Sequence, residues 1–222
     1  MTNIADNIKT LKEYASSRNV ELVVVSKKKS SSEIMKAYDS GQRIFGENIA
    51  QELVQKKDLL PADIQWHFIG HLQRNKVKYI ASFISMIQSV DSLRLMEEIQ
   101  KQAENHQRVI PCLLEIRIAD EITKNGMSYK SAEAILAGGE IKNMKNLKIC
   151  GLMGIGTFTN DEQKTRQEFR GLAEFFRAIK NSYFAEEKIF SILSMGMSDD
   201  YKIAIEEGST MVRIGSCVFG ER

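Results

Sequence analysis

A lysine ends the first strongly apolar run of the chain, Glu21 to Lys27. Strand-like alternation puts Val23, Val25 and Lys27 on one face of this run. Partial desolvation at the mouth of an apolar enclosure lowers the pKa of an amine and favours the neutral form that attacks a carbonyl. The position therefore predicts Schiff-base chemistry. The alternative is that the three consecutive lysines from Lys27 onward form a solvated run at a strand end.

Two later segments have the composition of anion sites. Ser194 to Ser198 precedes a stretch expected to be helical, Asp199 to Glu207, and the free N–H groups at the start of a helix favour a negative charge. Gly215 and Ser216 supply a backbone that a ligand can approach closely and a hydroxyl, the chemistry of a phosphate-binding turn. The alternative for the first segment is that Ser198 is only the N-cap of the helix.

Arg213 lies within an apolar run, Met211 to Val218, that reads as a buried strand. Burying an unpaired guanidinium is costly, so this side chain either pairs with a carboxylate or serves a ligand. A lysine, an arginine and a phosphate-binding turn at the same end of an enclosed fold are the protein groups that a pyridoxal phosphate site requires.

The elements that must position these residues follow a βα rhythm. Short runs rich in Val, Ile, Leu and Met alternate with longer amphipathic stretches, and several runs are apolar throughout, as strands covered on both faces are. Ser30 and Glu33 have the spacing of a helix capping box, and a helix is expected between Asp161 and Tyr183. The eight predicted strands are Glu21 to Lys27, Ile44 to Glu47, Gln65 to Ile69, Met86 to Val90, Val109 to Ile118, Lys148 to Gly154, Ile189 to Met195, and Met211 to Val218.

Eight parallel strands joined by right-handed helical crossovers predict an α/β fold, a single (β/α)8 TIM barrel with an extra N-terminal helix. The sequence has no linker or repeat that divides it, so we expect one domain over residues 1–222. An open doubly wound sheet is the alternative, but the first predicted strand is not followed by GxGxxG. In a barrel, ligands bind at the C-terminal ends of the strands, and a phosphate commonly lies after strands seven and eight.

Composition restricts the function classes further. The chain has 222 residues, and its 31 basic and 29 acidic side chains give a net charge of +2, which indicates neither a nucleic acid nor a membrane partner. The three cysteines are dispersed, which argues against disulfides and structural zinc. His67 and His71 lack an evident third ligand, so we expect no metal site. With neither a signal peptide nor a membrane span in the pattern, we expect a cytoplasmic protein.

Six ordered blocks of the sequence resemble the pyridoxal phosphate homeostasis protein family, which is related to the N-terminal barrel of alanine racemase. The resemblance spans most of the chain. The blocks are Val24-Val25-Ser26-Lys27; Phe45-Gly46-Glu47-Asn48 with Gln51-Glu52; Trp66 to Lys76; Gly151-Leu152-Met153; Leu193 to Tyr201; and Val212-Arg213-Ile214-Gly215-Ser216.

The resemblance implies a fold-type III barrel that carries pyridoxal 5'-phosphate, a form of vitamin B6, as a Schiff base on Lys27. Ser194, Gly215 and Ser216 would hold the phosphate, and Arg213 would face the pyridine nitrogen. A cation beside this nitrogen disfavours its protonation and weakens the cofactor as an electron sink. Asn48 is expected to line the same pocket.

The number of acid or base groups at the site distinguishes an enzyme from a non-catalytic binding protein. Racemisation needs two acid or base groups on opposite faces of the substrate carbon, and Lys27 supplies one at most. In racemases the other comes from a second domain, whereas this sequence ends at Arg222. We therefore expect a non-catalytic protein of intracellular pyridoxal phosphate homeostasis, a monomer or weak homodimer, that buffers the cofactor and delivers it to apo-enzymes. The alternatives are an amino-acid racemase or related enzyme and a cofactor-free interaction module.

Overall fold

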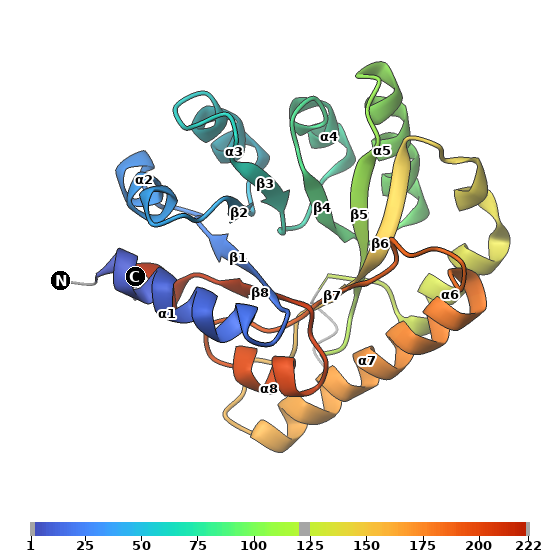
Figure 1. Ribbon diagram of the computed structural model, residues 1–222. Helices are drawn as coiled ribbons and strands as arrows, with labels where there is room; N and C mark the ends of the chain where they lie inside the picture. Colours follow the sequence, from blue (N-terminus) through green and yellow to red (C-terminus); the bar gives the residue numbers. More distant parts are fainter. Residues whose placement is uncertain (1–2, 120–124, 221–222) are drawn as a thin grey trace.

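Eight parallel strands form a closed barrel in the order of the sequence, with β1 beside β8 (Figure 1). The computed structural model describes residues 3–119 and 125–220. Closure of an eight-stranded parallel sheet is the TIM-barrel architecture that the βα rhythm predicts. The strands are β1 (Glu21–Val25), β2 (Ile44–Glu47), β3 (Gln65–Phe68), β4 (Met86–Val90), β5 (Ile110–Ile116), β6 (Leu147–Gly154), β7 (Ile192–Ser194) and β8 (Met211–Ile214).

Helices surround the barrel, and the extra N-terminal helix lies beside the C-terminal end of the chain (Figure 1). Within the described residues, no helix combines the length and the apolar composition needed to cross a bilayer. The helices are α1 (Ile4–Ser16), α2 (Ser31–Asp39), α3 (Ala50–Lys57), α4 (Arg74–Ile80), α5 (Leu93–Asn105), α6 (Tyr129–Gly138), the 3-10 helix η1 (Glu140–Asn143), α7 (Glu162–Tyr183), α8 (Tyr201–Glu206) and α9 (Ser216–Phe219).

Two helices expected from the sequence are present, and a side-chain cap begins each of them. Ser30 and Glu33 form the reciprocal capping box at the start of α2, with the Ser30 side chain bonded to the Glu33 amide and the Glu33 carboxylate bonded to the Ser30 amide. Asp161 caps α7 by accepting hydrogen bonds from two amides of the first turn. Such caps join residues two or three positions apart, so the spacing of residue types in the sequence can indicate them.

The prediction for the end of the last strand was wrong. Strand β8 stops at Ile214, and the residues predicted to continue it to Val218 instead form the short helix α9. Val218 is fully buried there, and its carbonyl accepts a hydrogen bond from Asn7 of α1 at 3.1 Å. A run of apolar residues shows that a segment is buried, but a buried strand and a buried helical turn share that pattern.

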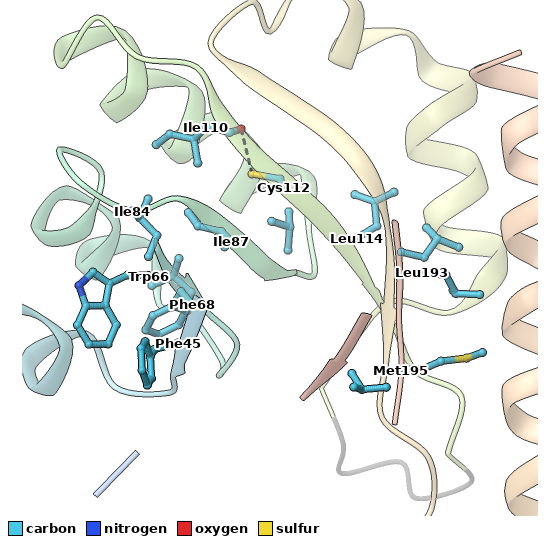
Figure 2. Packing of buried hydrophobic residues seen from close by; sticks show 14 of the residues in the cluster. Phe45, Trp66, Phe68, Ile84, Ile87, Ile110, Cys112, Leu114, Leu193 and Met195 are labelled. Carbon is cyan, nitrogen blue, oxygen red and sulfur yellow. Dashed lines mark hydrogen bonds between the residues drawn. The ribbon is translucent and has the colours of Figure 1, made fainter. Parts of the chain in front are cut away.

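Two apolar layers build the core. Leu22 and Val24 of β1 belong to the layer between the strands and the helices, whereas Val23 belongs to a cluster inside the barrel with Met86, Leu113, Cys150, Met153 and Met211. The alternation predicted for this strand is therefore confirmed for Val23. Figure 2 shows the outer layer, in which Phe45, Trp66 and Phe68 lie together on one side.

Candidate functional site

A cavity of about 430 Å³ lies at the C-terminal end of the barrel. Its lining comes from the turn after β1, the loop after β6, the loop after β7 and the end of β8. A volume of this size lies within the range of small-molecule sites, about 300 to 1,000 Å³. The lining includes Lys27, Lys29, Phe158, Met197, Ser198, Asp199, Arg213, Gly215 and Ser216.

Barrel closure brings the first and last strands to this cavity. In the register of the two strands, Val23 lies beside Arg213. Farther along, a Cβ added to Gly215 would lie only 3.3 Å from the Cβ of Val25. The turn that carries Lys27 therefore lies next to the Gly215–Ser216 turn, although the two are separated by almost the whole sequence. Lys27, Arg213, Gly215 and Ser216 all line the one cavity.

The Lys27 side chain is carried by a tight turn rather than by the strand itself. Strand β1 ends at Val25, and the Lys29 amide donates to the Ser26 carbonyl at 3.0 Å, which closes a four-residue turn. Lys28 has a φ of 60°, in the left-handed region that residues other than glycine rarely adopt. The turn places Lys27 half-buried at the cavity wall.

We expect Lys28→Gly to raise the free energy of unfolding by about 0.5 to 1 kcal/mol. A left-handed residue with a Cβ costs about 1 to 2 kcal/mol, and the greater freedom of glycine in the unfolded chain offsets part of the gain. Urea denaturation measures the change. Lys28→Ala is the control because it removes the charge but keeps the Cβ. Equal stabilisation by both substitutions would show that the charge, not the backbone conformation, is responsible.

Ser198 occupies a position beside the Gly215 turn. Its Oγ accepts hydrogen bonds from the amides of Gly215 and Cys217 at 3.3 and 3.4 Å. Ser198 is therefore not the N-cap of the following helix, which begins only at Tyr201. These two amides face an oxygen atom already, so the same turn presents donors to an oxygen-rich anion.

Asp200 occupies a backbone amide in the segment after β7, where the sequence predicted an anion site. The Met197 N–H donates to Asp200 Oδ1 at 2.6 Å. Helix α8 is also shorter than predicted, Tyr201–Glu206 instead of Asp199 to Glu207. Amides of both segments therefore have a side-chain acceptor already. Those after β8 are bonded to a neutral hydroxyl at 3.3 and 3.4 Å, which an anion can replace more readily than the Asp200 carboxylate at 2.6 Å.

Ser194 lies beneath the cavity, inside the barrel. It is fully buried, donates to Gln88 Oε1 at 2.7 Å and accepts a hydrogen bond from Arg213 Nη1 at 2.6 Å. It is not among the described residues that line the cavity. The structure therefore brings Ser194 to Arg213 rather than to the Gly215–Ser216 turn, and Ser198 is the hydroxyl near that turn.

Arg213 is held by neutral oxygens inside the barrel. Its Nη2 donates to the Gly154 carbonyl at 2.9 Å, in addition to the bond to Ser194. Burial lowers the pKa of the guanidinium to about 10, opposed by the charges of Asp200 and Glu115, so it stays charged at neutral pH. Burial also raises the pKa of Glu115 to about 7, an effect that Asp91 increases and Arg213 opposes.

Asn48 borders a neighbouring, smaller cavity of about 240 Å³. The structure does not bring it into the lining of the cavity that holds Lys27. Its Oδ1 is buried and has no hydrogen-bond partner among the described residues. Gly70 packs so closely on it that an added Cβ would lie 2.5 Å from the Asn48 carbonyl oxygen. Close packing against Gly70 thus fixes the Asn48 backbone just after β2, and the side-chain Oδ1 can accept a hydrogen bond from a ligand.

His67 and His71 lie in different surroundings. His67 lies inside the barrel, where its Nδ1 is 2.9 Å from Gln88 Nε2, and burial lowers its pKa to about 4. His71 is half-exposed, and its Nδ1 lies 3.3 Å from Asp91 Oδ2. In the part of the chain that the structure describes, no three His, Cys, Asp or Glu side chains are grouped as metal ligands.

Comparison with known proteins places this chain in a family. The family model of the alanine racemase N-terminal domain matches residues 1–222. Proteins named pyridoxal phosphate homeostasis protein are similar over most of their length. One from Aquifex aeolicus is 38% identical over 85% of this chain and 81% of its own. One from Schizosaccharomyces pombe is 36% identical over 96% of this chain and 88% of its own.

Solved structures agree with these sequence matches. PipY of Synechococcus elongatus, solved with PLP bound, superposes with a TM-score of 0.88 at 30% identity, covering 98% of this chain and all of that one. Alanine racemase from Bartonella henselae, at 15% identity and a TM-score of 0.71, shares the fold over 99% of this chain and 60% of its own. The chain therefore belongs to the alanine racemase N-terminal domain family, among its pyridoxal phosphate homeostasis proteins.

Proposed function

We propose that this protein binds pyridoxal 5'-phosphate through a Schiff base on Lys27 and acts in its homeostasis, buffering the cofactor and delivering it to apo-enzymes. The observation that carries the proposal is the single cavity lined by both the Lys27 turn and the Gly215–Ser216 turn. An amine and an anion-binding turn are the two groups needed to hold an aldehyde that carries a phosphate. The related PipY was solved with PLP bound.

The residues of the cavity fit each part of this cofactor. Lys27 provides the amine, and the amides after β8, with Ser216 and Ser198, provide donors for the phosphate. Arg213 adds a charged guanidinium to the same lining, which would face the ring of the cofactor. When bound, pyridoxal phosphate supplies an aldehyde and a ring that accepts electrons.

Arg213 favours holding the cofactor over catalysis. A guanidinium near the ring nitrogen disfavours protonation of that nitrogen, which reduces the capacity of the ring to accept electrons. Ser194 and the Gly154 carbonyl fix this guanidinium from below. We therefore assign Ser194 to the orientation of Arg213 and the phosphate to Gly215, Ser216 and Ser198. Asn48, with its unpartnered oxygen, is assigned to the rim on the β2 side.

The recipients and the compartment belong to the same proposal. Apo-enzymes that require pyridoxal phosphate are the chemical class of acceptor, because their own lysines exchange with an imine-bound aldehyde. We expect the exchange to take place in the cytoplasm, because three dispersed cysteines are typical of a reducing compartment.

A transfer assay tests the function. The protein is loaded with pyridoxal phosphate, freed of excess, and mixed with an apo-aminotransferase whose regained activity reports delivery. We expect reactivation by the loaded protein and none by the unloaded protein. In parallel, the loaded protein is incubated with L- and D-amino acids in deuterated water. Sustained exchange of the α-proton would establish an enzyme instead of a carrier, and failure to reactivate any apo-enzyme would contradict delivery.

A further inference from the structure

A buried lysine of α3 reaches the turn that carries Lys27. Lys56 is only 6% exposed, and its Nζ donates to three oxygens: the Ser26 carbonyl at 2.7 Å, Glu47 Oε1 at 2.7 Å and Glu52 Oε1 at 2.5 Å. The acceptors come from the turn after β1, the end of β2 and the first turns of α3. Because an ammonium has three hydrogens, these bonds use its full donor capacity.

These bonds hold the two peptide groups on either side of Lys27. The Ser26 carbonyl belongs to the peptide group before Lys27, and it accepts from Lys56. The Lys28 amide belongs to the peptide group after Lys27, and it donates to Glu52 Oε1 at 2.6 Å. Lys56 and Glu52 are themselves paired one helical turn apart. A single ion pair therefore sets the backbone orientation from which the Lys27 side chain leaves the turn.

Glu47 completes the network from the end of β2. It is fully buried, and its Oε1 also accepts from Ser26 Oγ at 2.6 Å. Burial raises the pKa of this carboxyl, while the bonds from Lys56 and Ser26 oppose the shift. Buried ion pairs are often no more stable than apolar residues of the same volume, so stability alone is a poor reason for this network. What the network does specify is the geometry of the turn.

We propose that Lys56, with Glu52 and Glu47, is a positioning group that directs the Lys27 amine into the cavity for capture of the aldehyde. The inference rests on the proposed function, because it concerns the same lysine. Lys56 does not itself line the cavity, so it acts through Lys27.

Two ligands separate positioning from general structural support. Pyridoxal 5'-phosphate bonds to Lys27, whereas pyridoxine 5'-phosphate carries an alcohol in place of the aldehyde and depends only on the rest of the cavity. The affinity of Lys56→Met for both ligands is compared with that of wild type by equilibrium titration. The matched control is Lys57→Met, the neighbouring residue, whose side chain is 45% exposed and pairs with Asp58 at the surface.

We expect Lys56→Met to weaken binding of pyridoxal 5'-phosphate at least tenfold and to change binding of pyridoxine 5'-phosphate less than twofold. Lys57→Met should change neither. Equal losses for the two ligands would show that the whole cavity depends on Lys56 for its shape. Unchanged affinity for pyridoxal 5'-phosphate would show that the amine needs no such support. Either result would overturn the proposal.

A double variant separates charge balance from geometry. Lys56→Met with Glu47→Gln removes both buried charges, so we expect it to recover stability lost by Lys56→Met alone. The Ser26 carbonyl still lacks its ammonium donor, so affinity for pyridoxal 5'-phosphate should stay low. Recovery of that affinity together with stability would assign Lys56 a structural role and would contradict positioning.

Hydrogen exchange of the ligand-free protein tests the turn without the cofactor. We expect the Lys28 amide to be protected in wild type and to exchange at least tenfold faster in Glu52→Ala, which removes its acceptor. Unchanged exchange in Glu52→Ala would overturn the positioning of the turn. Wild-type protein that binds neither ligand while this amide is protected would overturn the proposed function instead, so the two failures are distinguishable.

Discussion

Lys27→Ala should abolish the covalent adduct with pyridoxal phosphate completely. In wild type, borohydride reduction of the loaded protein is expected to add the mass of one reduced pyridoxyl phosphate group, mapped to the peptide that contains Lys27. The half-buried position of Lys27 at the cavity wall, beside the Gly215–Ser216 turn, is the reason. Lys29 lines the same cavity, but its ammonium is paired with Glu33 at 3.3 Å. Intact mass and peptide mapping after reduction measure the effect.

Lys28→Ala is the matched control for this substitution. Lys28 is adjacent in sequence, but its side chain is exposed and does not line the cavity among the described residues. The control should gain the same mass at Lys27 as wild type does. A stoichiometric adduct at another lysine of Lys27→Ala, formed with wild-type affinity, would refute the assignment of the amine.

Glu115→Gln should stabilise the protein at high pH and much less at low pH. Glu115 is 5% exposed, and burial raises its pKa from 4.5 to about 7. Between these values the unfolded chain releases the proton that the folded protein retains, so the stability contributed by the protonated carboxyl is lost as the pH rises from about 4.5 through about 7. A shift of this size corresponds to about 3 kcal/mol, and an amide avoids the loss.

Urea denaturation between pH 4.5 and 8 measures this dependence as the difference between the variant and wild type. We expect the difference to grow by about 3 kcal/mol in favour of Glu115→Gln across this range. His67 contributes an opposite slope, because its pKa is lowered to about 4 and the unfolded chain binds its proton first as the pH falls. That slope is common to both proteins and cancels in the difference. A difference independent of pH would contradict the ionisation of Glu115 in this range.

Much of the barrel follows from local sequence patterns. The alternation of β1, the capping box at Ser30 and the amphipathic stretch of α7 each involve residues two to four positions apart, and each is present in the structure. Errors concentrate where the apolar pattern continues while the backbone changes, as between Ile214 and Val218. Burial is encoded there, but the type of backbone is not.

The site was only partly accessible to the same reasoning. Lys27, Arg213, Gly215 and Ser216 stand at strand ends, and a closed barrel brings strand ends together. Ser194 and Ser198 lie four residues apart in one short segment, and no spacing rule distinguishes the serine that lies inside the barrel from the one beside the turn after β8. The position of Ser198 just after β7 was a sequence signal that it lies near the site. Its partners, the amides of Gly215 and Cys217, are distant in the sequence and could not be predicted from it.

The sequence alone indicated which residue faces are apolar, how many βα units the chain has, and that Lys27 and the Gly215–Ser216 turn lie near strand ends. These are properties of short segments, and periodicity records them. Tertiary structure alone decided that Asp200 takes the amide after β7, that Ser194 holds Arg213, and that Lys56 and Glu52 hold the Lys27 turn. Each of those contacts depends on the tight geometry of hydrogen bonds, which is settled only when the packed strands and helices bring donors and acceptors within about 3 Å.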